Sequence, residues 1–167
     1  MRIRNLSGAT RGSRADRGVR PPILASLVLL LVACGEKNAT MVDIGATEVG
    51  FPNGTKIRAD YVHKNLDVMR GMMFVDSLEK DRGKLMVHGS EGSFAYFMYQ
   101  TKIPLDIIWI SRAHRIVEIS ANTPPCPSKS ASACPSYGGN QKAQFVLEVN
   151  AGIAAANGLK IGDFLDF

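Results

Sequence analysis

The stretch that decides the fold is PLDIIWISRAHRIVEI, residues 104–119. Successive side chains of a strand point to opposite faces. Leu105, Ile107 and Trp109 therefore share one apolar face, while Asp106 lies among isoleucines on the other. The polar segment SRAHR predicts the tip of a hairpin, and RIVEI begins a second strand. The stretch thus predicts two paired strands with Trp109 in a hydrophobic core.

Strand signals continue on both sides of this stretch. VGFPNGTKI (49–57) places Pro-Asn-Gly between two extended segments and predicts another hairpin, because Asn and Gly tolerate positive φ. IGDFLDF (161–167) closes the chain as a final strand. Further strand-forming segments occur at 56–62, 84–88, 93–99, 105–110, 115–121 and 144–149.

Two short helices complete the predicted architecture. Asn65 is the expected N-cap of a helix over 66–73, and a helix over 151–157 is expected to end at Gly158. Because strands dominate, the pattern predicts a mainly β fold, an antiparallel β-sandwich or partly closed barrel, with α+β as the alternative. A chain of 167 residues suits one domain, which we place at 47–167.

The positive charge of the chain is confined to its amino-terminal arm. The formal net charge of +5 arises from 20 Lys and Arg against 15 Asp and Glu. Residues 1–33 hold six arginines and one acid, which leaves 14 cationic and 14 acidic residues in 34–167. That remainder has no cationic excess to hold phosphates, which argues against a nucleic-acid partner.

Residues 1–33 have the pattern of an export signal: a cationic segment, an apolar run from Ile23 to Ala33, and small residues at its end. The run is too short to span a bilayer as a helix. Its last residues, LVA, and Cys34 resemble the lipobox of bacterial lipoproteins. That resemblance implies a lipid on Cys34, cleavage before it, and a membrane as partner, with residues 34–46 as a tether. Ordinary signal cleavage or a chance match to the lipobox is the alternative.

The destination follows from the same motif. Gly35 follows the cysteine where an aspartate would imply retention in the inner membrane. The resemblance therefore implies an exported protein that is anchored in the cell envelope and faces the periplasm, with the outer membrane favoured where the host has one.

Two further cysteines lie in a proline-rich segment, PPCPSKSASACPSYGG. An exported domain meets an oxidising compartment, and the even number predicts one disulfide between Cys126 and Cys134. Free thiols or a metal pair are the alternatives, although CxxC spacing and a neighbouring histidine are lacking, so no metal site is predicted.

Several segments together resemble the family called domain of unknown function 192. They are RGMMFVDSL (70–78), FAYFMYQTKIPLDIIWI (94–110), RIVEI (115–119), FVLEVNAG (145–152) and LKIGD (159–163). The resemblance covers roughly residues 47–167 and implies a compact β-rich domain, often exported, with no established activity. Met98-Tyr99-Gln100 stands where the family usually shows a Met-Lys-Asn-type run, so the family's cationic residue is missing here.

Candidate ligand-binding residues come from charges in apolar strands. Asp106 and Glu148 each share a strand face with apolar residues and need a partner if buried. Arg70, at the end of the first helix, is the candidate cation, and we expect it to pair with one of these acids. The pair would either fix helix against sheet or form the polar end of a small cleft. Two carboxylates facing one cavity would also suit acid–base catalysis.

Met98 and Tyr99 complete the candidate set. Tyr99 ends a strand and could line a ligand groove, as could Tyr96, Tyr137 or Trp109. Met98 belongs to five methionines within thirty residues, which suit an irregular core, a flexible ligand surface or a Cu(I) site. The other four are Met69, Met72, Met73 and Met86.

The sequence contains none of the short catalytic motifs GxSxG, HExxH, GxxxxGK or GxGxxG. We therefore predict no catalytic residues and no cofactor. The favoured function is a non-enzymatic binding or interaction module for an unidentified small molecule or envelope component. The alternatives are a hydrolytic or modifying enzyme that uses Asp106 and Glu148, and copper handling through the methionines.

Overall fold

The computed structural model describes residues 45–167. The predicted signal peptide, Cys34 and all but the last two residues of the predicted tether lie outside this range. Within it, no helix is long and apolar enough to cross a bilayer.

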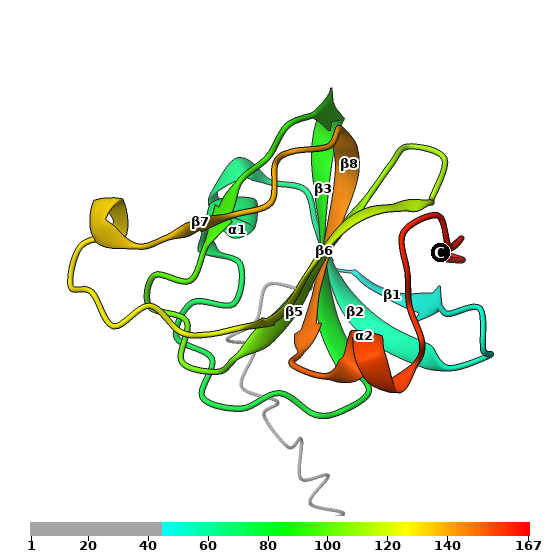
Figure 1. Cartoon of the computed structure of the whole chain (residues 1–167), viewed down its shortest axis with the longest axis horizontal. Helices are drawn as coiled ribbons and strands as arrows, with labels where there is room; N and C mark the ends of the chain where they lie inside the picture. Colours follow the sequence, from blue (N-terminus) through cyan, green and yellow to red (C-terminus); the bar gives the residue numbers. More distant parts are fainter. Residues whose placement is uncertain (1–44) are drawn as a thin grey trace, which may run out of the picture. The chain divides into compact units, whose positions relative to one another are not determined.

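A twisted six-stranded sheet forms the centre of the domain (Figure 1), with the strand order β1-β2-β3-β8-β5-β6. Strands β2 and β3 run parallel, whereas the other neighbouring pairs are antiparallel. A separate two-stranded ribbon pairs β4 with β7. The strands are β1 (Ala46–Gly50), β2 (Lys56–Val62), β3 (Arg82–Gly92), β4 (Tyr96–Phe97), β5 (Leu105–Ile110), β6 (Ile116–Thr123), β7 (Ser136–Tyr137) and β8 (Ala143–Asn150).

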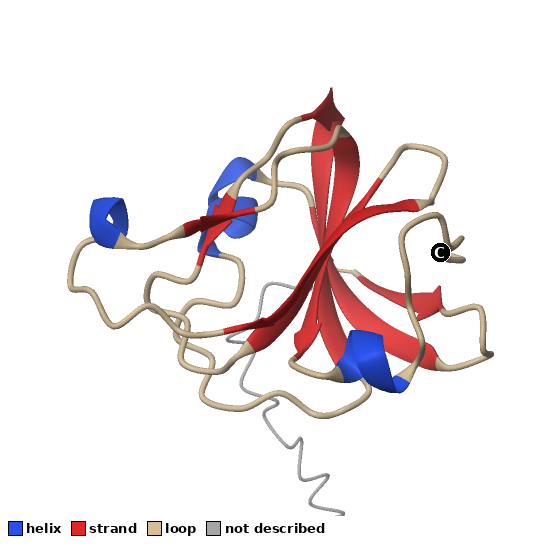
Figure 2. Ribbon diagram, viewed as in Figure 1, coloured by secondary structure: helices blue, strands red, loops and turns tan. Residues whose placement is uncertain are grey.

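The predicted fold class is confirmed: the domain is mainly β and carries two short α-helices, α1 (Asn65–Arg70) and α2 (Ile153–Ala156) (Figure 2). The sheet does not close into a barrel, and the molecule is sandwich-like. The parallel β2–β3 pair was not predicted. Parallel neighbours need a crossover connection, and residues 63–81, which include α1, supply it.

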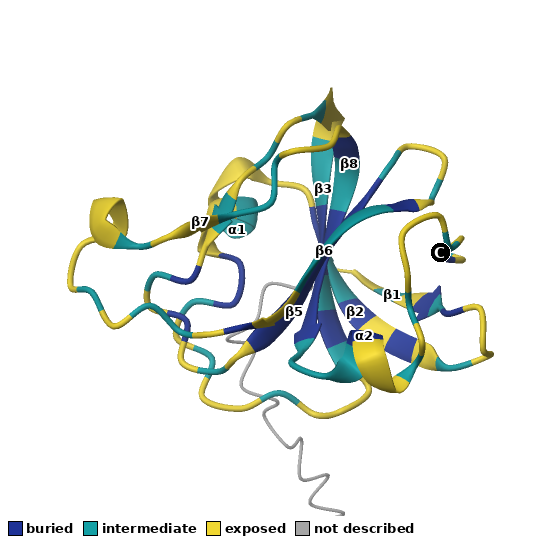
Figure 3. Cartoon of the chain, viewed as in Figure 1, coloured by how far each residue is buried: buried dark blue, intermediate teal, exposed yellow. Residues whose placement is uncertain are grey.

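The two faces of the sheet carry two separate hydrophobic clusters, and the buried positions run along its central strands (Figure 3). One cluster gathers Ile108, Ile110 and Leu147 with Ala154 of α2 and Leu165 near the C-terminus. The other lies against the β4–β7 ribbon and contains Leu105, Ile107 and Trp109 together with Met72, Met86 and Met98. The side-chain alternation expected for residues 105–110 is therefore confirmed.

Strand β5 lies between β8 and β6, so all six of its residues are buried. Trp109 is fully buried, as predicted, and its indole Nε1 donates a hydrogen bond to the carbonyl oxygen of Phe94 at 2.8 Å. This bond ties the segment before β4 to the sheet. The predicted hairpin over 49–57 also forms, with β1 and β2 antiparallel and Val49 opposite Ile57.

The ends of several elements differ from the prediction. Helix α1 stops at Arg70 because Gly71 leaves the helical conformation, with φ 46° and ψ −126°. Lys64 rather than Asn65 occupies its N-cap position, without a side-chain capping bond. The predicted strand over 93–99 is reduced to β4, and the C-terminal segment makes isolated bridges at Phe164 and Asp166 in place of a strand.

The predicted disulfide is present between Cys126 and Cys134, whose Cα atoms are 5.7 Å apart. It closes a loop that contains a short 3-10 helix, η1 (Ala131–Ala133), immediately before β7. Cys126 also packs against the cluster that contains Trp109. The bridge therefore fixes the loop that leads into the β4–β7 ribbon.

Candidate functional site

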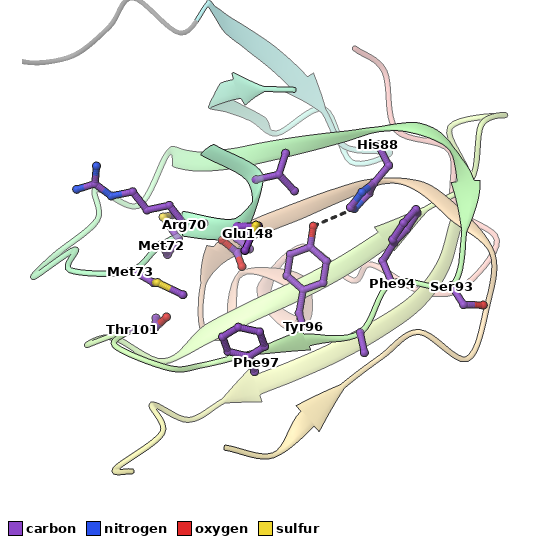
Figure 4. A pocket seen from close by; sticks show the side chains of 14 residues that line it. Arg70, Met72, Met73, His88, Ser93, Phe94, Tyr96, Phe97, Thr101 and Glu148 are labelled. Atoms are coloured by element: carbon purple, nitrogen blue, oxygen red, sulfur yellow. Dashed lines mark hydrogen bonds between the residues drawn. The ribbon is translucent and has the colours of Figure 1, made fainter. Parts of the chain in front are cut away.

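A pocket of about 380 Å³ opens between α1 and the segment that carries β4 (Figure 4). Its floor is the face of the central sheet that carries Glu148. Its walls are mostly apolar and aromatic, as is usual for small-molecule sites. Fourteen residues line it: Val68, Met69, Arg70, Gly71, Met72, Met73, His88, Ser93, Phe94, Ala95, Tyr96, Phe97, Thr101 and Glu148.

Glu148 is the acidic group of this pocket. It lies on β8, between its cross-strand partners Lys84 on β3 and Ile107 on β5, and only 5% of it is exposed. Its Oε2 atom is buried without a hydrogen-bond partner. A carboxylate oxygen buried in this way normally has a donor, so Oε2 is an open acceptor at the base of the pocket.

Gly71 allows this carboxylate to lie directly beneath the end of α1. A Cβ atom on residue 71 would lie 3.3 Å from Oε2 and 3.5 Å from Oε1 of Glu148, and the positive φ of 46° also disfavours a side chain there. Any larger residue would crowd the carboxylate and strain the backbone.

Burial raises the pKa of Glu148 to about 7, because desolvation penalises the charged form more than the neighbouring ammonium of Lys84 and the backbone of Met72 favour it. The carboxyl group therefore changes charge near neutral pH. A titratable group with this property in a pocket is a typical feature of a functional site.

Lys84 is the cross-strand partner of Glu148 on β3, yet the two do not form a salt bridge within the described residues. Its Nζ atom donates instead to the carbonyl oxygen of Gly71. Desolvation lowers the pKa of Lys84, while Glu148, Asp60 and Asp67 raise it. The ammonium of Lys84 is thus attracted by three acids and not by Glu148 alone.

An aromatic group forms the opposite wall of the pocket. The Tyr96 hydroxyl and His88 Nε2 are hydrogen-bonded at 3.1 Å, and His88 stacks on Phe94 with ring centroids 3.5 Å apart (Figure 4). Tyr96 also meets the Trp109 ring edge-on at 5.9 Å. Burial lowers the pKa of His88 and, together with the charge of Glu148, raises that of Tyr96. Both side chains are therefore neutral at pH 7.

At the rim of the pocket, apolar side chains are exposed and two residues have strained backbone conformations. Phe74 and Gln100 adopt positive φ values of 65° and 54°, and the Phe74 amide donates to the Gln100 carbonyl at 2.9 Å. Exposed side chains beside them include Met69 (72% exposed), Phe74 (50%) and Phe97 (42%). Strained non-glycine positions concentrate at functional sites.

The structure separates the two acids that the sequence analysis singled out. Glu148 is opposite Ile107 on the face that carries the pocket, whereas Asp106 is opposite Val149 on the other face. Asp106 accepts hydrogen bonds from the backbone amides of Asn122, at 2.8 Å, and Ala154, at 2.7 Å. It therefore ties α2 to the sheet and fixes the end of β6 beside β5.

The expected ion pair of Arg70 is not formed: among the ion pairs of residues 45–167, none contains Arg70. Arg70 does line the pocket together with Glu148. Its guanidinium points away from the cavity in Figure 4, and its Cζ lies 5.9 Å from the centre of the Phe74 ring. The exposed end of α1 lets this side chain remain in solvent.

Met98 and Tyr99 are adjacent to the pocket without lining it. Met98 is 1% exposed and packs in the Trp109 cluster, and its carbonyl oxygen accepts the amides of Thr101 and Cys126. The Tyr99 hydroxyl donates to the carbonyl oxygen of Lys129 in the disulfide loop at 3.3 Å. Met98 is thus a core residue, and Tyr99 bonds to the disulfide loop.

Sequence analysis missed His88, Phe94 and Phe97 as pocket residues and ranked Tyr96 below Tyr99. The aromatic run FAYF (94–97) was a usable signal, because small-molecule pockets are lined predominantly by hydrophobic and aromatic side chains. No comparable signal marked His88. Its role depends on stacking against Phe94, which only the tertiary structure shows.

Comparisons with known proteins identify the family of the chain. The model of the DUF192 family, described as "Uncharacterized ACR, COG1430", matches residues 49–167. The chain belongs to the DUF192 family. A search of curated proteins finds no match.

Two solved structures resemble this DUF192 protein. One is a protein of unknown function from Novosphingobium aromaticivorans DSM 12444, with 26% identity over 73% of this chain and 84% of that chain, and a TM-score of 0.64. The other, from Sinorhizobium meliloti 1021, is provisionally labelled a transcription regulator; it has 23% identity over 75% of this chain and 96% of that chain, and a TM-score of 0.67. The second likeness concerns the fold alone.

Proposed function

We propose that this DUF192 protein is a lipid-anchored module of the cell envelope that binds a small molecule in the pocket above Glu148. The observation that carries the proposal is the unpartnered Oε2 atom of Glu148, buried at the base of a mostly apolar cavity of about 380 Å³. A ligand that supplies a donor to this oxygen would satisfy it, and apolar walls would bury the rest of that ligand.

Binding fits the geometry better than catalysis by paired carboxylates. Asp106 and Glu148 lie on opposite faces of the sheet, so they cannot act on one substrate as acid and base. Both oxygens of Asp106 also accept backbone hydrogen bonds. A single titratable carboxyl group in an apolar pocket suits recognition of a ligand.

The anchor is supported by the sequence LVAC (31–34) after an apolar run, and by the confinement of excess positive charge to residues 1–33. The disulfide between Cys126 and Cys134 is consistent with an oxidising compartment. The neutral charge balance of residues 34–167 supports a partner other than nucleic acid.

The binding proposal is tested by screening small apolar and aromatic compounds against the full chain and following backbone amide chemical shifts. We expect binders to shift the amides around Glu148 and Tyr96. Phe97→Ala removes one aromatic wall of the pocket. It should weaken the affinity of these binders several-fold, because an aromatic contact contributes about 1 kcal/mol. Phe164→Ala is the matched control, since Phe164 is a comparably exposed phenylalanine that does not line the pocket. Equal weakening by both variants, or shifts only elsewhere, would contradict the proposal.

The anchor is tested by intact-mass spectrometry and fractionation of the native protein and of Cys34→Ser. We expect the native chain to begin at an acylated Cys34 and to sediment with membranes, and the variant to lack the lipid mass and leave the membrane fraction. A native species of unmodified mass would refute the anchor without affecting the pocket.

A further inference from the structure

We infer that the pocket recognises an organic ammonium ion, that is, an amine on an apolar or aromatic body, with Glu148 as the counter-ion. This inference rests on the proposed binding function and specifies the class of ligand. It is drawn from the charge, the hydrogen-bonding state and the walls of the site.

The first observation is the hydrogen-bonding state of the carboxylate. Oε2 of Glu148 is buried without a donor. The pocket residue with the strongest donors, Arg70, points its guanidinium away in Figure 4. An ionised carboxylate only accepts hydrogen bonds, and an ammonium group supplies up to three donors. Such a charge-assisted bond is roughly twice as strong as a neutral one.

The second observation is the charge around the carboxylate. Lys84, the one cation beside Glu148 that influences its titration, directs Nζ to the Gly71 carbonyl and is also attracted by Asp60 and Asp67. Tyr96 and His88, on the other side, are neutral at pH 7. The ammonium of Lys84 is thus engaged by the Gly71 carbonyl and does not donate to Oε2 of Glu148, which leaves this oxygen open to a second cation.

The third observation is the nature of the walls. Tyr96, Phe97 and Phe94 line the cavity, and the faces of aromatic rings attract cations and pack well against apolar groups. Met72 and Met73 add adaptable thioether surface. A carboxylate ligand would instead meet the charge of Glu148 in a poorly solvated space, which is repulsive.

The cavity volume sets the size of the ligand. At the roughly 30 Å³ that one water molecule occupies in the liquid, 380 Å³ corresponds to about a dozen groups of that size. This matches an arylalkylamine of the size of tryptamine. Tryptamine, tryptophol and indole-3-acetate therefore form a matched series in which the same indole carries a cationic, a neutral or an anionic end.

The test measures the affinity of the full chain for these three compounds at pH 8 by calorimetry, with amide chemical shifts to locate binding. We expect tryptamine to bind at least tenfold more tightly than tryptophol, and indole-3-acetate to bind most weakly. Glu148→Gln should remove the tryptamine advantage, because it keeps the shape of the side chain and loses the charge. Glu79→Gln is the control, since Glu79 is exposed and outside the pocket.

A second readout uses the unsubstituted protein. Because the pKa of Glu148 is about 7, about a tenth of the carboxyl groups are ionised at pH 6 and about nine tenths at pH 8. An alkylammonium stays charged over this range, as lysine does. Tryptamine should therefore bind about tenfold more tightly at pH 8 than at pH 6, while tryptophol changes little.

The outcomes separate the two proposals. Equal affinity of tryptamine and tryptophol for the pocket, or tighter binding of indole-3-acetate, would overturn the ammonium inference and leave the binding function standing. An absence of binding by all three compounds would overturn the inference and remove support from the binding function as well. A tryptamine advantage that persists in Glu148→Gln would show that another group supplies the negative charge, which also refutes the inference.

Discussion

The substitution Glu148→Gln tests the electrostatics of the pocket without any ligand. The pKa of Glu148 is about 7 in the fold against its ordinary value of 4.5, and desolvation is the largest cause. The folded state therefore binds the proton more tightly than the unfolded state, so the stability of the native protein falls as the pH rises from about 4.5 to about 7. Each pKa unit corresponds to about 1.4 kcal/mol. The expected loss for the native protein between pH 5 and pH 8 is about 2–3 kcal/mol from this residue.

The variant cannot ionise at position 148, so this part of the pH dependence should disappear. The assay is urea unfolding of both proteins at pH 5 and pH 8. For each protein the free energy of unfolding at pH 8 is subtracted from that at pH 5, and the two differences are compared. Burial of His88, which lowers its pKa, acts in both proteins and cancels. Glu79→Gln, an exposed substitution of the same chemistry, should keep the native pH dependence. If native protein and Glu148→Gln lost the same stability between the two pH values, the argument that burial controls this carboxyl group would be wrong.

Three further predictions concern the scaffold. Asp106→Asn should cost about 2–4 kcal/mol of unfolding free energy, because its amide cannot accept both backbone bonds that Asp106 holds; a loss below about 1 kcal/mol in urea unfolding would contradict that role. Gly138→Ala should lower the melting temperature strongly, since its Cβ would lie 2.1 Å from the Trp109 ring, whereas Gly54→Ala, also at positive φ but in open space, should cost only about 1 kcal/mol; equal losses would refute the clash. Replacing Cys126 and Cys134 by Ser should cost roughly 2–3 kcal/mol through loop entropy, measured by thermal unfolding against the oxidised protein, and an unchanged melting temperature would show that the bridge is not needed.

The sheet faces that carry the two acids, Asp106 and Glu148, show where inference from the sequence ends. The alternation along residues 105–110 predicted that Asp106 and Trp109 point to opposite faces of the sheet, and the structure confirms this. The same alternation also predicted that Glu148 shares a face of its own strand with apolar residues. Whether Glu148 and Asp106 share a face depends on the register between β5 and β8, and Ile107 rather than Asp106 is the partner of Glu148. A shift of one residue would have reversed the answer.

Helix α1 shows a second limit. Met69 is one of the five methionines for which an irregular core was one expectation, but Met69 and Leu66 of this helix are 72% and 81% exposed. The helix ends at Gly71, which lies against the Glu148 carboxylate where a Cβ atom would crowd it, and Met69 lines the pocket at this end of the helix. Propensity and periodicity contain no information about that constraint, since it comes from a residue on a strand distant in sequence.

The sequence alone determined the fold class, the hairpin over 49–57, the burial of Trp109 and the disulfide, because each depends on short-range alternation, turn residues or cysteine count. The tertiary structure decided which face of the sheet became a pocket, which acid became its base, and that Arg70 stays in solvent. Those outcomes depend on strand register and on the path of the crossover between β2 and β3. Both are fixed by packing among residues far apart in the chain, so no local pattern could reveal them.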